Sequence, residues 1–94
     1  MRITERLRAL SGEIKELETE AGILAEQLEF QTDVAEDARI RALVSETPLA
    51  DRDAREAKQD LERMQRSFDD VRHRVQALRD EQDRLLEALA GRRG

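Results

Sequence analysis

Two runs of apolar residues, spaced alternately four and three positions apart, constrain the fold of this chain more than any other feature. The first run spans residues 3–42 and the second spans residues 54–89, and a single glutamine interrupts each of them. Such spacing puts apolar side chains at the a and d positions of a heptad, which form the seam of a left-handed coiled coil. In order, the seam residues are Ile3, Leu7, Leu10, Ile14, Leu17, Ala21, Leu24, Leu28, Gln31, Ala35, Ala38 and Ala42, then Ala54, Ala57, Leu61, Met64, Phe68, Val71, Val75, Leu78, Gln82, Leu85 and Leu89. The sequence therefore predicts an all-α protein made of two long helices.

The amino-acid composition favours a narrow apolar seam between two helices over the wide core of a globular domain. Charged residues make up 41% of the chain, and two phenylalanines are its only aromatic residues. High charge is also typical of disordered chains, but two heptad runs of this length favour folded helices. The chain contains no cysteine, which excludes disulfides and thiolate metal sites and is compatible with a reducing compartment.

The segment between the two runs contains the only proline. Thr47 is a favourable N-cap and Pro48 a favourable first helical residue, while proline disfavours helical backbone at the residue before it. Gly91 is a plausible C-terminal stop. These signals predict a single domain with helix 1 over about 3–45, a turn at about 46–48, helix 2 over about 48–90 and a basic tail at 91–94.

A connection this short makes the two helices antiparallel neighbours. Residues whose numbers sum to about 95 or 96 then face each other, so that Leu17 meets Leu78 and Leu10 meets Leu85. Flanking charges agree with this register in part. The favourable pairs are Glu18–Arg79, Glu20–Arg74 and Arg41–Asp53, and the like-charged neighbours are Arg39–Lys58 and Glu13–Glu81. The competing structure is one continuous helix through residue 48 that pairs with a second chain.

A second set of apolar residues on helix 1 lies outside the seam, at the c and g heptad positions: Ile23, Phe30, Val34 and Val44. A two-helix hairpin leaves this stripe in water, and a contiguous apolar stripe favours an interface over ordinary surface. We therefore expect a homodimer in which two hairpins form a four-helix bundle. A docking site for another protein is the alternative.

The polar residues inside the seam have two interpretations. Gln31 and Gln82 either fix the register of the helices or mark a recognition site, and the register role is the more common use. His73 has no second histidine or cysteine with which to form a metal site, so we expect it on the surface.

The pattern of reactive residues argues against catalysis. The sequence has no nucleophile–base arrangement, no glycine-rich phosphate loop and no metal-ligand spacing, so we expect no enzyme activity, cofactor or metal. The net charge of −5 disfavours nucleic-acid binding, although Arg63, Arg66, Arg72 and Arg74 offer a local basic set. The sequence has no apolar run of membrane-spanning length, and we expect a cytoplasmic protein without membrane insertion.

The turn and the downstream helix carry a resemblance to known proteins. The segment Thr47-Pro48-Leu49-Ala50-Asp51-Arg52-Asp53-Ala54, followed by Ala57 and Lys58, is similar to the hairpin tips of Gre- and DksA-type transcription factors. The resemblance implies a coiled coil that enters the secondary channel of RNA polymerase, with Asp51 and Asp53 as tip acids and Glu46 as a third. The whole chain resembles small coiled-coil hairpin proteins of high-GC bacteria.

Two functional hypotheses follow. The first is a non-enzymatic, self-associating scaffold or adaptor that uses the stripe on helix 1. The second is a regulator that places its acidic tip in RNA polymerase or another large complex.

Overall fold

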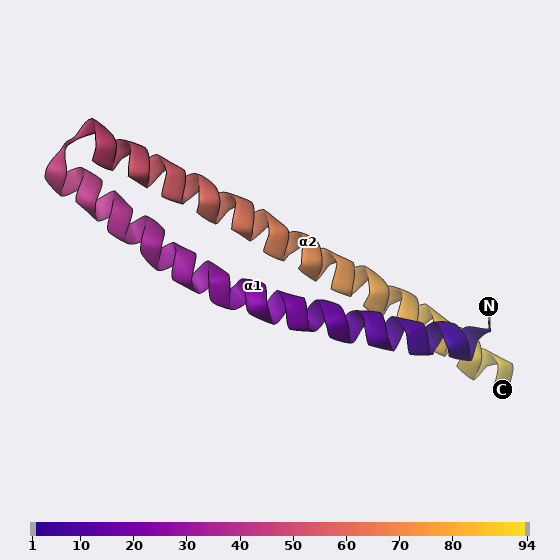
Figure 1. Ribbon diagram of the computed structural model, residues 1–94. Helices are drawn as coiled ribbons and strands as arrows, with labels where there is room; N and C mark the ends of the chain where they lie inside the picture. Colours follow the sequence, from indigo (N-terminus) through magenta and orange to yellow (C-terminus); the bar gives the residue numbers. More distant parts are fainter. Residues whose placement is uncertain (1, 94) are drawn as a thin grey trace. The chain divides into compact units, whose positions relative to one another are not determined.

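The computed structural model describes residues 2–93 and confirms an all-α helical hairpin (Figure 1). Helix α1 comprises Ile3–Ser45 and helix α2 comprises Pro48–Arg93, so the first helix has the bounds expected from the sequence. The second helix continues three residues past its expected end at residue 90. Gly91 does not adopt a positive φ, so it extends the helix instead of stopping it. The tail expected at 91–94 is therefore helical up to Arg93, and residue 94 lies outside the described residues.

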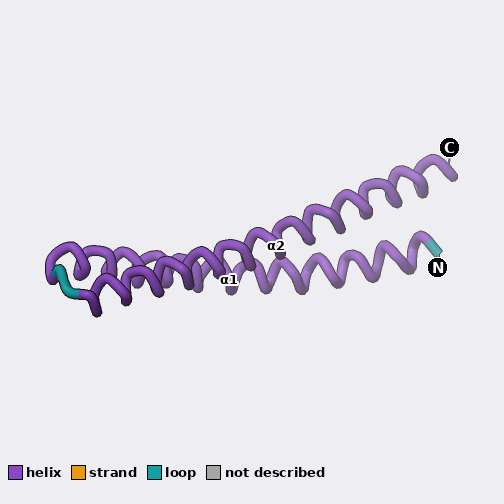
Figure 2. Tube along the Cα trace, turned by 90° about the horizontal axis from the view of Figure 1, so that it is seen from above, coloured by secondary structure: helices purple, strands orange, loops and turns teal. Residues whose placement is uncertain are grey.

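The turn, drawn in teal in Figure 2, is held by a cap on each side. Glu46 has a φ of 51°, and its N–H donates a hydrogen bond of 3.1 Å to the carbonyl oxygen of Ala42. This is a left-handed C-cap, a conformation that glycine adopts more easily than glutamate. On the other side, the hydroxyl of Thr47 accepts a hydrogen bond of 3.2 Å from the N–H of Ala50. The expected N-cap is thus confirmed.

The chain divides into two compact units. One unit, here called the terminal unit, contains residues 1–21 and 70–94. The other, the turn unit, contains residues 22–69. In each unit a part of α1 lies beside a part of α2 (Figure 1).

The terminal unit holds a core of large aliphatic side chains. Leu10, Ile14 and Leu78 are buried, and Leu17, Val75 and Leu85 pack against them. Leu10, Leu17, Leu78 and Leu85, which the predicted register brought together, all belong to this cluster. Each fully buried leucine contributes roughly 1.5–3 kcal/mol of transfer free energy, so this cluster stabilises the pairing of the helices.

The turn unit has a seam of smaller side chains. Its buried residues are Ala38 and Ala57, one from each helix. Gln31 is half-buried, and its Nε2 donates a hydrogen bond of 3.2 Å to the backbone oxygen of Ala57 on α2. The polar seam residue therefore links the two helices, in agreement with a role in fixing their register.

Candidate interaction surfaces

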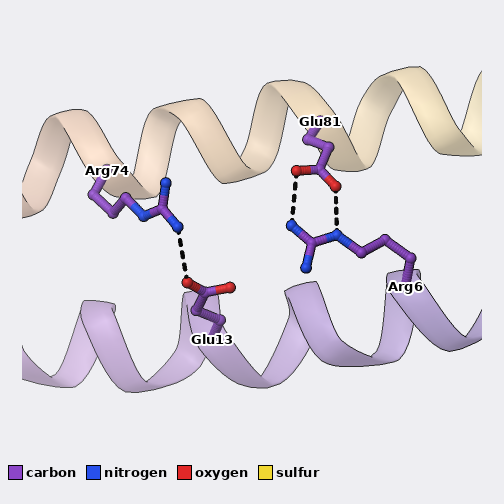
Figure 3. A network of polar contacts seen from close by, with 4 residues as sticks. All are labelled: Arg6, Glu13, Arg74 and Glu81. Carbon is purple, nitrogen blue, oxygen red and sulfur yellow. Dashed lines mark hydrogen bonds and ion pairs between the residues drawn. The ribbon is translucent and has the colours of Figure 1, made fainter. Parts of the chain in front are cut away.

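Ion pairs close one flank of the seam in the terminal unit (Figure 3). The guanidinium of Arg6 holds both carboxylate oxygens of Glu81, with Nε–Oε2 at 2.6 Å and Nη2–Oε1 at 2.9 Å. Arg74 Nη2 lies 3.1 Å from Glu13 Oε1. The predicted pairing of Arg74 with Glu20 is wrong, because Glu13 takes this arginine. The repulsion expected between Glu13 and Glu81 is offset, since each carboxylate has its own guanidinium.

The other flank of the terminal unit is closed in the same way. Arg79 pairs with Glu18, which confirms the predicted contact. On the first flank, the Arg6 guanidinium lowers the pKa of the Glu81 carboxyl below its ordinary value, chiefly by hydrogen bonding. Charged side chains thus cover both sides of the seam in this unit.

The stripe on α1 is largely open to solvent. The exposed fractions are 53% for Ile23, 71% for Phe30 and 79% for Val44, while Val34 is half-buried. Ile23 and Phe30 line a groove of about 510 Å³ together with Met64 from α2. The sequence analysis did not predict that Met64 lines this groove. The signal was available, because Met64 is a seam residue at a d position and Gln31, which also lines the groove, is another.

A second groove of about 370 Å³ lies on the other flank of the turn unit, and we call it the basic groove. Arg39, Arg55 and Lys58 line it together with the apolar residues Ala35, Ala54 and Leu61, with Thr32 and Glu36 completing the lining. The structure thus brings the like-charged neighbours Arg39 and Lys58 to one groove, as the register predicted. Arg39 is held by Glu36 on its own helix through bonds of 3.0 and 2.6 Å, a contact that lowers the pKa of the Glu36 carboxyl.

The tip candidates Glu46, Asp51 and Asp53 are all exposed around the turn. Among residues 2–93, the structure shows no cluster of three or more acidic or histidine side chains suited to a metal ion. The turn also carries exposed apolar side chains that sequence reasoning missed, namely Ile40, Leu43 and Leu49. Ile40 and Leu43 lie at f and b heptad positions and Leu49 lies at a c position, all outside the seam, and this placement is the signal that could have found them.

The remaining candidates lie on the surface. His73 is exposed, as expected, and so are Arg63, Arg66, Arg72 and Arg74. Arg63 pairs with Asp60 and Arg74 pairs with Glu13, so part of this basic set is neutralised within the chain.

Compared with known proteins, the chain matches no family model, no curated protein and no solved structure. Within the described part of the chain, neither helix contains a stretch apolar enough to cross a bilayer.

Proposed function

We propose that this chain is a non-enzymatic protein–protein interaction module that associates with further copies of itself through the stripe on α1. A homodimeric four-helix bundle is the simplest such assembly. The observation that carries the proposal is the exposure of Ile23 and Phe30, at 53% and 71%, along a groove that α2 completes with Met64. Contiguous apolar surface of this kind marks interfaces more often than ordinary surface.

The contrast between the two units supports this choice of surface. In the terminal unit, the g positions hold Arg6 and Glu13, and both are engaged in ion pairs with α2. In the turn unit, the g positions of α1 are Gln27, Val34 and Arg41, and the two nearest to Phe30, Gln27 and Val34, carry no charge. Burying one phenylalanine side chain contributes roughly 1.5–3 kcal/mol, so a few such residues from each copy can offset the cost of association.

Sedimentation equilibrium at several micromolar concentrations tests the proposal. We expect the wild-type chain to sediment above its monomer mass of 10.8 kDa. Phe30→Gln should shift the mass to that of the monomer, because it removes the exposed ring while keeping a good helix former. Ala9→Gln is the matched control, since Ala9 is an exposed c residue of the terminal unit outside the stripe. A wild-type monomer at every concentration would contradict self-association.

The acidic turn favours a second candidate function. Glu46, Asp51 and Asp53 are exposed at a turn whose backbone is capped on both sides, which suits presentation of charge to a large complex such as RNA polymerase. Asp51→Asn combined with Asp53→Asn should abolish any effect on transcription in a purified system without loss of helicity. An unchanged effect would rule out this mechanism. Both functions are proposed for the cytoplasm.

A further inference from the structure

Acidic residues lie on one side of Phe30. Glu26 and Asp33 lie four residues before and three residues after it, and Glu29 directly precedes it. Residues three and four apart are neighbours on a helix surface, so the carboxylates of Glu26 and Asp33 border the ring. All three acidic residues are exposed, as is the ring. We call Phe30 with Glu26, Glu29 and Asp33 the acidic knob.

The basic groove has the complementary chemistry. Its floor contains Ala35, Ala54 and Leu61, and its cations are Arg39, Arg55 and Lys58. Glu36 holds Arg39, but Arg55 and Lys58 form no ion pair among the described residues. Cations above an apolar floor fit an apolar side chain that is flanked by carboxylates.

The charge pattern beside the seam in this groove differs from the pattern at the same heptad positions in the terminal unit. There, the e positions of the two helices pair Glu18 with Arg79. In the turn unit, the e residues Arg39 and Lys58 line one groove and carry the same charge. Glu36 already offsets the charge of Arg39, so a negatively charged occupant would chiefly offset Lys58 and the neighbouring Arg55.

We propose that the acidic knob of one copy docks into the basic groove of the next copy. This inference rests on the proposed self-association and names the surface that receives Phe30. The groove of about 370 Å³ is large enough, because an apolar cavity of about 150 Å³ takes up a benzene molecule. Docking brings Glu26 and Asp33 toward Arg55 and Lys58, which have no acidic partner within the described chain.

Charge also disfavours the symmetric alternative. A two-fold axis that packs the stripe against its own copy runs the two α1 helices antiparallel around Phe30. This places Glu26 of one copy close to Asp33 of the other, and like charges across an interface oppose association. Knob-in-groove docking avoids that contact.

The assembly that follows is head-to-tail. The knob is centred on a c position of α1, whereas the basic groove lies along the e positions, so one copy can bind a neighbour on each flank. Such a heterologous interface produces open chains unless the rotation between copies closes a ring. Association should therefore grow with concentration beyond the dimer.

Two half-blocked variants test this arrangement. Phe30→Gln removes the knob and keeps the groove, while Arg55→Glu with Lys58→Glu reverses the groove and keeps the knob. We expect each variant alone to sediment as a monomer. Their equimolar mixture should form a one-to-one complex of about twice the monomer mass that does not grow further, because each end is blocked.

The outcomes separate this inference from the proposed function. If Arg55→Glu with Lys58→Glu still self-associates as the wild type does, or if the mixture stays monomeric while the wild type associates, knob-in-groove docking is overturned and self-association stands. If the wild type never associates, both fall. Arg8→Glu with Arg66→Glu is the matched control for charge, and it should associate like the wild type. Circular dichroism checks that each variant keeps its helices. The milder change Arg55→Gln with Lys58→Gln, which removes the two charges without reversing them, should weaken association at least tenfold.

Discussion

Leu78 is the side chain whose truncation should reveal most clearly what holds the two helices together. It is 2% exposed and lies in the buried cluster with Leu10 and Ile14. Leu78→Ala removes three carbons at about 0.8 kcal/mol each, or about 2.4 kcal/mol of transfer free energy. The cavity left behind adds to this, which brings the expected loss to about 3–5 kcal/mol.

Leu86 on the same helix provides the matched control. Its exposed fraction is 49%, so Leu86→Ala loses about half the transfer term, roughly 1 kcal/mol, and leaves no closed cavity. At about 4–8 °C per kcal/mol for a domain of this size, the melting temperature should fall by at least 12 °C for Leu78→Ala and by about 4–8 °C for Leu86→Ala.

The assay is thermal unfolding followed by circular dichroism at one low protein concentration, so that association contributes equally to all samples. The reasoning depends on the difference between the two leucines. Equal losses in the two variants would refute it, because they would mean that burial in the seam is not the main source of stability.

Three further changes address the turn, the ion pairs and the interface. Glu46→Gly should raise the melting temperature by several degrees in the same assay, since glycine avoids the roughly 1–2 kcal/mol cost of a left-handed residue, and a lower value would argue against the φ of 51°. The pKa of Glu81 is lowered in the folded chain, so its contact with Arg6 contributes fully above the ordinary glutamate pKa of about 4.3 and is lost as the pH falls through the lower folded value. The melting temperatures of wild type and Arg6→Gln should accordingly differ at pH 7 and converge in acid, whereas a gap that persists at low pH would speak against this ion pair. Raising NaCl to 1 M shortens the Debye length to about 3 Å and should weaken self-association measured by sedimentation, and strengthening would instead indicate a purely apolar contact.

The heptad pattern was sufficient to predict the fold. Every residue assigned to the seam is buried or half-buried in the structure, because the alternation of three and four positions fixes which side of each helix faces its neighbour. The proline and its preceding threonine located the turn for a similarly local reason: the N-cap hydrogen bond and the fixed φ of proline depend on adjacent residues only.

Contacts for which one side chain has several possible partners were harder to predict from the sequence. The simple register placed Arg74 near Glu20 and Glu13 near Glu81, whereas the structure pairs Arg74 with Glu13 and Glu81 with Arg6. Gly91 was expected to end α2, yet a glycine inside a helix costs only about 1 kcal/mol relative to alanine, and the helix continues. The stripe on α1 was predicted as a set of residues, but its groove with Met64 and the basic groove on the other flank require both helices in place.

The residues of the two units suit them to different roles, the terminal unit to stability and the turn unit to recognition of a partner. The terminal unit combines large aliphatic side chains with ion pairs on both flanks of the seam. The turn unit has alanines at its most buried positions, the exposed Ile23 and Phe30 on one flank, and the like-charged Arg39 and Lys58 on the other. Small seam residues contribute less burial free energy, and like-charged neighbours oppose the pairing of the helices. We therefore expect the turn unit alone to be less stable than the terminal unit. Binding of a second copy through Phe30 and the basic groove would add burial free energy, because the ring becomes buried. It would also reduce charge repulsion, because Arg55 and Lys58 gain acidic partners. On this reasoning, hydrogen exchange in the turn unit should slow when the chain associates, while exchange in the terminal unit should stay nearly unchanged.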